Sequence, residues 1–456
     1  MKTDVIIIGS GQAGVPLATR LAGANKRVVL FERSELGGTC INSGCTPTKT
    51  MVASARAAHV ARTADRLGVH AGGVEVDFSA VIARKDAIVR RWRDGINKRL
   101  DGVKDRVELV RAHARFVGSH EVEAAGKRYS APIIFVNTGA NAIVPSIPGL
   151  DRAGHLDNMS VMNLSALPRE LLVMGGGYIG CEFGQMFRRF GAGVTIVDHN
   201  PHLLAREDPE TSSALEAVFR AEGVRLVLGA RIARVEKTEA QLSLELADGT
   251  RLTGSHLLVA TGRSPNTREL GCEVAGIELD ARGSIEVDDG YQTSVPGVYA
   301  VGDVTGGPQF THTSWDDHRL LFERLSGGAA RSRSGRIFPS VVFTDPQIAR
   351  VGLSEREARQ RGIAFEVASM PFGNVARAIE TDETAGTMKV LIDPQSEKIL
   401  GATLVGVEAG ELLHVFVALM QAGASARAIV DAEFVHPTFS EGVQTLVMRL
   451  PRYALS

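Results

Sequence analysis

Two stretches of this chain repeat one pattern, in which a short apolar strand is followed by a glycine-rich turn and a helix. The first runs from Val5–Ile8 through GSGQAG at residues 9–14, and the second from Leu171–Met174 through GGGYIG at residues 175–180. In such G-x-G-x-x-G turns, glycine allows the tight bend and lets a pyrophosphate reach the helix N-terminus. The six motif glycines are Gly9, Gly11, Gly14, Gly175, Gly177 and Gly180. The repeat predicts an α/β chain with two Rossmann-like dinucleotide-binding domains.

An acidic residue ends the second apolar strand of each unit: Glu32 in the first unit and Asp198 in the second. A carboxylate at this place accepts hydrogen bonds from the ribose hydroxyls of a dinucleotide. Asp198 should also repel the 2′-phosphate of NADPH, so the second unit favours NADH. His199 and Arg206 lie close enough in the sequence to leave NADPH as an alternative.

Length and charge narrow the class of protein. A chain of 456 residues is too long for one core and suggests about three domains. Lysine and arginine number 51 against 52 aspartates and glutamates, so no excess of positive charge points to nucleic acid or to an anionic membrane. The first residues lack the features of a signal peptide, and no apolar run reaches the roughly 18 residues of a membrane span. We therefore expect a cytoplasmic protein without nucleic-acid or membrane partners.

Four cysteines occur, too few for a disulfide-held scaffold, and two of them lie close together. Cys40 and Cys45 belong to GGTCINSGCTPTK at residues 37–49, where glycines allow a disulfide to close with little strain. Pro47 suits the first turn of a helix, so Cys45 should lie near a helix N-terminus, where the dipole lowers a thiol pKa. No second pair at ligand spacing is near, so we expect no zinc site. The pair predicts redox chemistry.

The chain changes character after Arg336, where no further glycine motif occurs. Residues 388–393 and 399–405 have the pattern of a hairpin, and residues 411–421 have the apolar spacing of a helix. These patterns predict a third domain that serves packing or dimer formation. The arginine-rich residues 331–336 should form an exposed linker whose charges need no partner.

The cysteine segment resembles the redox-active disulfide motif of the class I pyridine nucleotide-disulfide oxidoreductases, which include glutathione reductase, lipoamide dehydrogenase and mercuric reductase. Residues 293–303 resemble the second FAD motif of this family, residues 137–139 and 260–263 its two crossover turns, and residues 436–441 its C-terminal His–Glu segment. The resemblance covers essentially the whole chain. It implies bound FAD, NADH or NADPH as electron donor, and a homodimer formed by an α+β interface domain.

The resemblance also implies roles for individual residues. Cys40 would be the thiol that attacks the substrate, and Cys45 would be the thiol beside the flavin. Lys49 would pair with Glu182 near the flavin. Tyr178 would shield the flavin until the nicotinamide arrives.

His436, oriented by Glu441, would reach across the homodimer interface as the acid–base of thiol exchange. A thiolate is the attacking species, and an imidazole can manage its proton near neutral pH. The resemblance places further cofactor contacts at Thr39, Thr138, Gly139, Gly262, Arg263, Gly302 and Asp303. Cys181 and Cys272 match no motif and should pack in the interior.

The resemblance implies four consecutive segments. Residues 1–148 would form the first part of the FAD-binding domain and residues 149–264 the NAD(P)H-binding domain. Residues 265–335 would form the second part of the FAD-binding domain and residues 336–456 the interface domain.

Within the family, the chain is most similar to the branch that contains mercuric reductase and the reactive-chlorine-resistance flavoproteins of the RclA type. Residues 47–50, 204–209 and 304–311 carry this similarity. Mercuric reductases pass Hg(II) in through a C-terminal cysteine pair, whereas this chain has no cysteine after Cys272. A dedicated mercury site is therefore not expected, although soft thiolates still bind Hg(II) and copper ions.

The sequence therefore predicts an FAD-dependent oxidoreductase that passes electrons from NADH or NADPH through Cys40 and Cys45 to a disulfide or a soft metal ion. One alternative is a lipoamide dehydrogenase-like component of an acyl-transfer complex, against which the GGPQFT form of residues 306–311 argues. Another is a non-catalytic redox sensor, which would need neither a Lys49–Glu182 pair nor a His–Glu pair.

Overall fold

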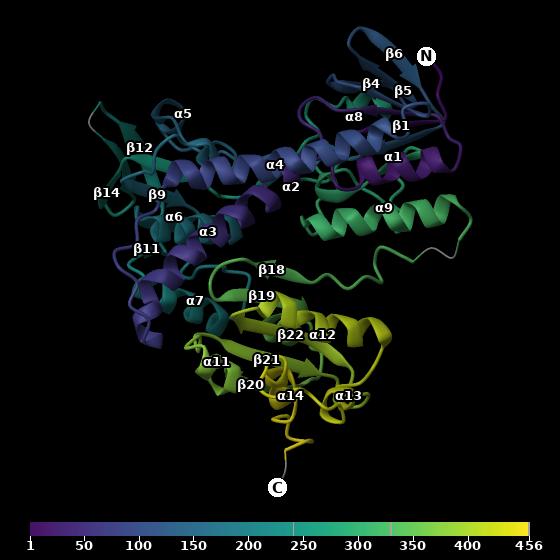
Figure 1. Ribbon diagram of the computed structural model, residues 1–456. Coiled ribbons are helices and arrows are strands. Elements are labelled where there is room, and N and C mark those ends of the chain that lie inside the picture. The colour runs from purple at the N-terminus through teal and green to yellow at the C-terminus, as the bar shows by residue number, and fades with distance from the viewer. Residues whose placement is uncertain (240, 329–330, 455–456) are drawn as a thin grey trace. The chain divides into compact units, whose positions relative to one another are not determined.

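The computed structural model describes residues 1–239, 241–328 and 331–454 (Figure 1). The last two residues of the predicted interface domain, 455 and 456, lie outside the described residues. The chain divides into two compact units. Unit 1 comprises residues 1–50, 80–143 and 262–336, and unit 2 comprises residues 51–79, 144–261 and 337–456. Among the described residues, no helix is both long and apolar enough to cross a membrane.

A five-stranded parallel sheet forms the centre of unit 1. Its strands, in spatial order, are β17 (Val298–Ala300), β7 (Ile133–Val136), β1 (Val5–Ile8), β2 (Val28–Phe31) and β3 (Val107–Val110). Strand β1 has the predicted bounds and is wholly buried, as expected for a parallel sheet that is covered on both faces. Its side chains alternate between two cores, with Val5 and Ile7 in one and Ile6 and Ile8 in the other.

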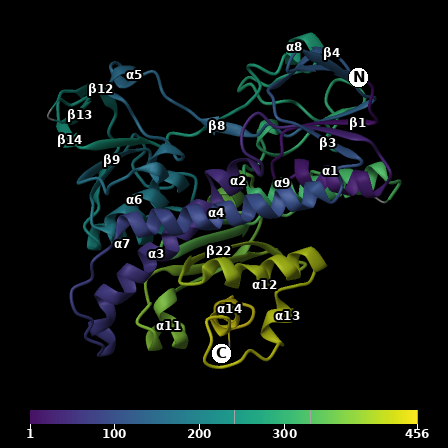
Figure 2. The same ribbon diagram turned by 45° about the horizontal axis from the view of Figure 1, so that its top comes forward.

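Helices cover this sheet, and smaller sheets flank it. Helices α1 (Gly14–Gly23) and α9 (Thr311–Leu325) lie side by side (Figures 1 and 2). Strands β4 (Ala114–Gly118), β5 (Glu121–Ala124) and β6 (Lys127–Ser130) form an antiparallel sheet, and β8 (Ala140–Ala142) pairs with β16 (Arg263–Pro265). The remaining elements that lie wholly in unit 1 are α2 (Gly38–Asn42), α8 (Cys272–Ala275) and η3 (Gly302–Thr305). Helices α3 (Cys45–Thr63) and α4 (Phe78–Asp101) each contain a boundary between the units.

Unit 2 contains a second parallel sheet, of four strands. Its strands, in spatial order, are β11 (Arg225–Leu228), β10 (Gly193–Asp198), β9 (Glu170–Met174) and β15 (His256–Val259). The second glycine turn joins β9 to α6 (Tyr178–Phe190), as the first joins β1 to α1. The predicted pair of Rossmann-like domains is confirmed. Other elements of this part are η1 (Ala64–Leu67), α5 (Leu150–Ala153), η2 (Ser160–Asn163), α7 (Pro209–Ala221) and the antiparallel strands β12 (Ile232–Lys237), β13 (Leu242–Leu246) and β14 (Arg251–Gly254).

The C-terminal part of unit 2 is an α+β domain around an antiparallel sheet. Its strands, in spatial order, are β18 (Ser340–Val342), β19 (Gln347–Gly352), β22 (Ile399–Gly406), β21 (Thr387–Ile392) and β20 (Glu366–Pro371). Strands β21 and β22 are the predicted hairpin, and α12 (Ala409–Ala422) contains the predicted helix and packs on β19 and β22 (Figure 2). Its other helices are α10 (Glu355–Gln360), η4 (Phe372–Asn374), α11 (Ala376–Glu380), α13 (Arg427–Val430) and α14 (Glu441–Val447).

The prediction of an exposed linker at residues 331–336 whose charges need no partner is wrong at Arg336, whose side chain is buried, and Arg331 also pairs with Asp316 at 3.0 Å. The Arg336 side chain is only 6% exposed and forms ion pairs with Asp317 and, at 3.1 Å, with Asp316. Asp317 also accepts hydrogen bonds from the Tyr291 hydroxyl at 2.6 Å and from the Gly302 backbone N–H at 2.8 Å. The carboxylates come from a distant helix, so local composition could not distinguish Arg336 from its exposed neighbours.

We expect Arg336→Met to lower the free energy of unfolding by about 3–5 kcal/mol, because it leaves the buried Asp317 carboxylate without its cation. Arg331→Met is the matched control, because the Arg331 side chain is 41% exposed and also pairs with Asp316. That control should change stability by less than about 1 kcal/mol. Denaturant unfolding of both variants measures the difference, and equal losses would contradict the assignment.

Candidate dinucleotide and dithiol sites

The first glycine turn fits tightly against the end of β7. A Cβ on Gly9, whose φ is +105°, would lie 2.3 Å from the Asn137 backbone oxygen, and one on Gly14 would lie 2.0 Å from the Gly9 oxygen. A Cβ on Gly11 would lie 2.7 Å from the Asn137 side-chain oxygen. That oxygen accepts a hydrogen bond from Gly14 N at 3.1 Å, and Asn137 Nδ2 donates to the Val301 carbonyl at 3.0 Å. Asn137 was predicted to lie in a turn, but its side chain also joins the start of α1 to the end of β17, which no local sequence signal indicates.

Glu32 lies beside this turn, at the carboxyl end of β2. It is buried and accepts hydrogen bonds from Ser10 N at 3.0 Å, Ser10 Oγ at 2.6 Å and Ser34 N at 2.8 Å. A carboxylate accepts about four hydrogen bonds, so Glu32 can accept another from a ribose hydroxyl. The turn and the acid together suit the nucleotide end of a dinucleotide.

A second group of predicted cofactor residues gathers elsewhere in unit 1. Arg263 lies 3.6 Å from Asp303 and donates to the Ala140 carbonyl, while its buried Nε has no hydrogen-bond partner among the described residues. Burial raises the pKa of Asp303, and the Arg263 charge opposes this rise. The buried Thr313 hydroxyl likewise has no partner among the described residues. Such orphaned polar atoms fit a polar ligand, so the residues present are compatible with bound FAD.

Two further predicted residues, Thr138 and Gly139, follow β7 in the same unit. The Thr138 hydroxyl donates to the Asn266 carbonyl at 3.0 Å, and Asn266 Nδ2 donates back to the Thr138 carbonyl at 2.8 Å. Gly139 and Gly262 have φ angles of +70° and +140°, which favour glycine at both turns. The two turns lie at opposite ends of the β8–β16 ladder.

The second glycine turn repeats the tight contact but leaves one glycine open. A Cβ on Gly175 would lie 2.5 Å from the Ala260 oxygen, and one on Gly180 would lie 1.9 Å from the Gly175 oxygen. A Cβ on Gly177 would meet nothing within 4 Å. The bare backbone at Gly177 therefore suits the approach of a ligand to the start of α6 rather than protein packing. Asp198 lies beside the turn and accepts a hydrogen bond from Gly176 N at 2.5 Å.

The start of α6 presents Tyr178 and, one turn later, Glu182. The Tyr178 hydroxyl donates to Glu207 Oε1 at 2.7 Å, and Arg350 Nε lies 3.2 Å from the other Glu207 oxygen. Burial and the Glu207 charge raise the pKa of Tyr178, so the phenol keeps its proton. Glu182 is buried and accepts a hydrogen bond from Phe343 N at 2.9 Å. Lys49 and Glu182 belong to different units, so their pairing stays a prediction.

The two cysteines lie on consecutive helices. Cys40 is half-buried within α2, and Cys45 is the exposed first residue of α3. The prediction that Pro47 occupies the first turn of a helix is confirmed. Cys45 Sγ lies 3.0 Å from the hydroxyl of Thr311, which begins α9 and which sequence analysis did not single out. The hydrogen bond with Cys45, together with burial, raises the pKa of the Cys40 thiol.

Thr39 supports the turn between these cysteines. A Cβ on Gly44 would lie 2.9 Å from the Thr39 backbone oxygen, and that oxygen also accepts a hydrogen bond from Ser43 N at 2.9 Å. The other two cysteines, Cys181 and Cys272, are buried, as expected for packing residues.

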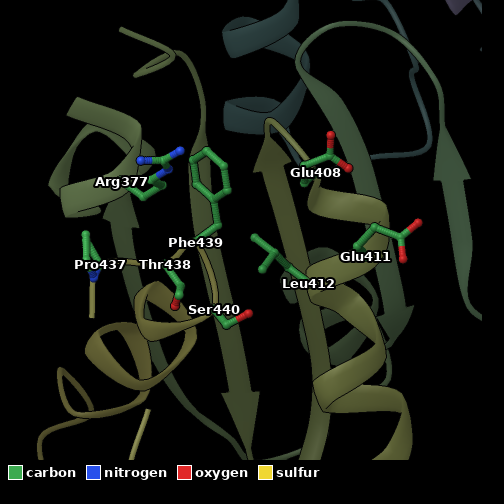
Figure 3. Close-up of a pocket in the computed structure, with 8 residues that line it drawn as sticks. All are labelled: Arg377, Glu408, Glu411, Leu412, Pro437, Thr438, Phe439 and Ser440. Carbon is green, nitrogen blue, oxygen red and sulfur yellow. The ribbon is translucent and has the colours of Figure 1, made fainter. Parts of the chain in front are cut away.

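His436 and Glu441 meet in the C-terminal domain. Their Nδ1 and Oε2 atoms lie 2.8 Å apart, with the Glu441 side chain 17% exposed and the imidazole 71% exposed. The carboxylate can hold the proton on Nδ1 and leave Nε2 directed outward as an acid–base. Figure 3 shows a pocket beside this segment, and its lining residues are Arg377, Glu408, Glu411, Leu412, Pro437, Thr438, Phe439 and Ser440.

One acidic cluster lies elsewhere in unit 2. Asp208, Glu210 and Glu355 bring their carboxylates together, but the Lys389 ammonium group lies among them, 3.2 Å from Asp208 and 2.7 Å from Glu355. Asp208 also accepts hydrogen bonds from the first two backbone N–H groups of α10. This arrangement joins the nucleotide-binding part to the C-terminal domain and needs no metal ion.

Two Rossmann-like domains, an accessible cysteine pair and an α+β domain define a flavin-dependent disulfide reductase. Residues 3–317 match the family described as pyridine nucleotide-disulphide oxidoreductase, and residues 338–447 match its dimerisation domain. The chain belongs to this family. It is an FAD-dependent NAD(P)H oxidoreductase of the disulfide- and metal-reducing kind, and its dimerisation domain supports a homodimer.

Individual relatives agree with this assignment. The probable pyridine nucleotide-disulfide oxidoreductase RclA of Escherichia coli (strain K12) is 36% identical over 455 residues, which cover 98% of each chain. Mercuric reductase of Bacillus cereus is 33% identical over 449 residues, which cover 98% of this chain and 71% of that protein. The solved Cu(II) complex of the HOCl-induced flavoprotein disulfide reductase RclA from Escherichia coli matches with a TM-score of 0.90 at 35% identity, covering 98% of this chain and 99% of that one.

We predict different effects for two substitutions in the second glycine turn, one mainly on stability and the other mainly on nucleotide binding. Gly180→Ala should lower the free energy of unfolding by about 1–3 kcal/mol, because its Cβ meets a backbone oxygen that cannot move freely. Gly177→Ala should lower it by less than about 1 kcal/mol yet weaken nucleotide binding, because its Cβ would occupy the ligand's approach. Thermal unfolding and NAD(P)H titration measure the two effects, and equal loss of stability in both variants would contradict the prediction.

Proposed function

We propose that Cys40 and Cys45 are the redox-active pair, with Cys45 on the flavin side and Cys40 facing the acceptor. The observation that carries this proposal is the asymmetry of the pair. Cys45 begins α3 and contacts the Thr311 hydroxyl, whereas burial and the Cys45 sulfur disfavour ionisation of Cys40. One sulfur is thereby suited to remain a thiolate and the other to hold a proton.

Electrons and protons balance over the pair. NAD(P)H gives up a hydride, whose two electrons break the S–S bond and whose proton remains on Cys40, which leaves Cys45 as a thiolate. When bound, FAD would supply the redox relay between NAD(P)H and the disulfide. The glycine turn at residues 9–14, Glu32, Arg263 and Asp303 would hold it. The Cys40 thiol, once deprotonated, attacks the acceptor.

His436 is proposed as the base that takes the Cys40 proton, with Glu441 orienting its ring. The 2.8 Å contact between the two side chains and the exposed imidazole support this role. By family resemblance the imidazole would serve the partner subunit of a homodimer. The pocket of Figure 3 is lined by residues of the matched dimerisation domain, so we assign it to the dimer face.

Lys49 and Glu182 are proposed to pair near the flavin, and Tyr178 is proposed to cover the flavin until the nicotinamide arrives. Glu182 is buried with one oxygen on Phe343 N, which suits a carboxylate that needs a fixed position. We also propose a cytoplasmic location, where a reducing environment keeps a catalytic dithiol available.

Two classes of acceptor suit the pair: a small disulfide and a soft metal ion. One solved relative is a Cu(II) complex of a flavoprotein disulfide reductase, and copper ions favour thiolate ligands. A lipoamide dehydrogenase-like role and a non-catalytic redox sensor are the alternatives. The His436–Glu441 contact favours a catalyst over a sensor, because a sensor needs no acid–base pair.

The test is NAD(P)H consumption against a panel of glutathione disulfide, lipoamide, Cu(II), Hg(II) and a quinone. Cys40→Ser and Cys45→Ser should each lower turnover with the thiol-dependent acceptors by at least about a thousandfold, as loss of a catalytic nucleophile does. Quinone reduction should persist in both variants, because it needs only the flavin, and it serves as the control for folding and cofactor content. Unchanged disulfide and metal turnover in Cys45→Ser would reject the proposal.

We further propose NADH as the preferred donor. The Asp198 carboxylate lies at the end of β10 with its side chain 10% exposed, where it can bond a ribose hydroxyl and repel a 2′-phosphate. Asp198→Ser should reduce the preference for NADH, measured as the ratio of kcat/KM values, by about tenfold, or roughly 1.4 kcal/mol. A native preference for NADPH would contradict the proposal.

A further inference from the structure

The first residues of helices α3 and α9 meet at the Cys45 sulfur atom. Cys45 is the first residue of α3, which has 19 residues, and Thr311 is the first residue of α9, which has 15 residues. The distance between Cys45 Sγ and Thr311 Oγ1 is 3.0 Å. Helix N-termini carry partial positive charge and stabilise nearby anions. Neither helix has an acidic residue in its first turn that would compete with an anionic sulfur for this charge.

The Thr311 hydroxyl is not used to cap its own helix. Phe310 occupies the N-cap position of α9 and makes no side-chain capping hydrogen bond. Threonine is favoured at the N-cap itself, where its oxygen accepts a backbone hydrogen bond. In α9 the threonine is instead the first helical residue, one position after the N-cap, and its hydroxyl contacts the Cys45 sulfur. A purely structural role in starting the helix therefore does not account for the side chain.

The direction of this hydrogen bond follows from the charge on the sulfur. When Cys45 is a thiol, either atom can donate. When Cys45 is a thiolate, it has no proton, so the hydroxyl must donate and the bond becomes charge-assisted. Hydrogen bonds to charged groups are about twice as strong as neutral ones.

We propose that Thr311 is a catalytic residue whose hydroxyl donates to the Cys45 thiolate and so keeps the negative charge on the flavin-side sulfur after reduction. The inference rests on the proposed function, in which reduction of the disulfide leaves Cys45 as a thiolate and Cys40 as a thiol. Threonine and serine can supply this donor, whereas valine has nearly the same shape as threonine and cannot.

Other ionisable groups also influence the sulfur pair. Cys40 on α2 forms a hydrogen bond with Cys45, and the Thr311 hydroxyl and the Lys49 charge on α3 act to lower the pKa of the Cys40 thiol. His312 follows Thr311 on α9, but it is exposed and its ring stacks on Phe310 at 5.3 Å. These ionisable groups remain in place when Thr311 is replaced, so a changed ionisation midpoint of Cys45 in Thr311→Val is due to the loss of the Thr311 hydroxyl.

The experiment follows the ionisation of Cys45 in two ways. In the FAD-loaded protein reduced with NADH, the pH dependence of the long-wavelength thiolate–flavin absorbance band gives a midpoint. In a Cys40→Ser background, where Cys45 is the exposed cysteine, the pH dependence of iodoacetamide labelling, read by mass spectrometry, gives a second midpoint without reference to turnover. We expect Thr311→Val to raise both midpoints by about one to two pH units, the size expected for loss of a hydrogen bond to a charged group.

Thr311→Ser is the matched control and should keep both midpoints within about half a pH unit of the native values, because serine supplies the same hydroxyl donor. Native midpoints in Thr311→Val would overturn the inference, and so would a shift in Thr311→Ser as large as that in Thr311→Val. If Thr311→Val lost its flavin, the labelling midpoint alone would decide, with Thr311→Ala as a second variant.

The outcomes also separate this inference from the proposed function. If the native protein gave no thiolate–flavin band and Cys45→Ser kept full turnover, the proposed roles of the cysteines would fail. If the native protein gave the band and Thr311→Val gave it with the same midpoint, only the role of Thr311 would fail.

Discussion

One steric contact underlies both nucleotide-binding domains: a glycine with positive φ lies against the backbone carbonyl at the end of a neighbouring parallel strand. Gly9 meets the Asn137 oxygen in this way, and Gly175 meets the Ala260 oxygen. In each case the residue that provides this carbonyl also donates its own backbone N–H to the last carbonyl before the turn, Asn137 to Ile8 and Ala260 to Met174, both at 2.8 Å. Only glycine permits this approach, and it lets the chain turn directly into a helix whose N-terminus faces the carboxyl edge of the sheet.

The acid of each unit is fixed by the same turn. The second motif residue donates its backbone N–H to the carboxylate, Ser10 to Glu32 at 3.0 Å and Gly176 to Asp198 at 2.5 Å. The first unit adds the Ser10 hydroxyl, which donates to the same Glu32 oxygen. The carboxylates are therefore oriented before any ribose arrives, which reduces the conformational entropy that ligand binding would otherwise lose.

Features with a local signal could be predicted from the sequence, and those that depend on contacts between distant segments could not. The bounds of β1 and the hairpin of β21 and β22 follow from short apolar runs and turn residues, and the structure confirms them. The burial of Arg336 depends on ion pairs with Asp316 and Asp317, which lie twenty and nineteen positions earlier in the sequence. No local pattern predicts these contacts. The position of Cys45 at a helix start could be predicted from Pro47 and is confirmed, whereas Thr311 lies 266 residues from Cys45 and meets it only through the fold. The redox role of the Cys40–Cys45 pair stays a prediction. The pairing of Lys49 with Glu182 is still a prediction from resemblance.

Cys45 is exposed at the start of a helix, and this position affects how easily its sulfur is damaged by oxidation. A sulfur that is both accessible and stabilised as an anion reacts readily with oxidants and electrophiles. In the proposed disulfide form the same atom would be bonded to Cys40 and protected. Damage should therefore accumulate when reductant is plentiful and acceptor is scarce, because the vulnerable sulfur then persists. A supply of acceptor protects the protein itself, in addition to completing its catalytic cycle.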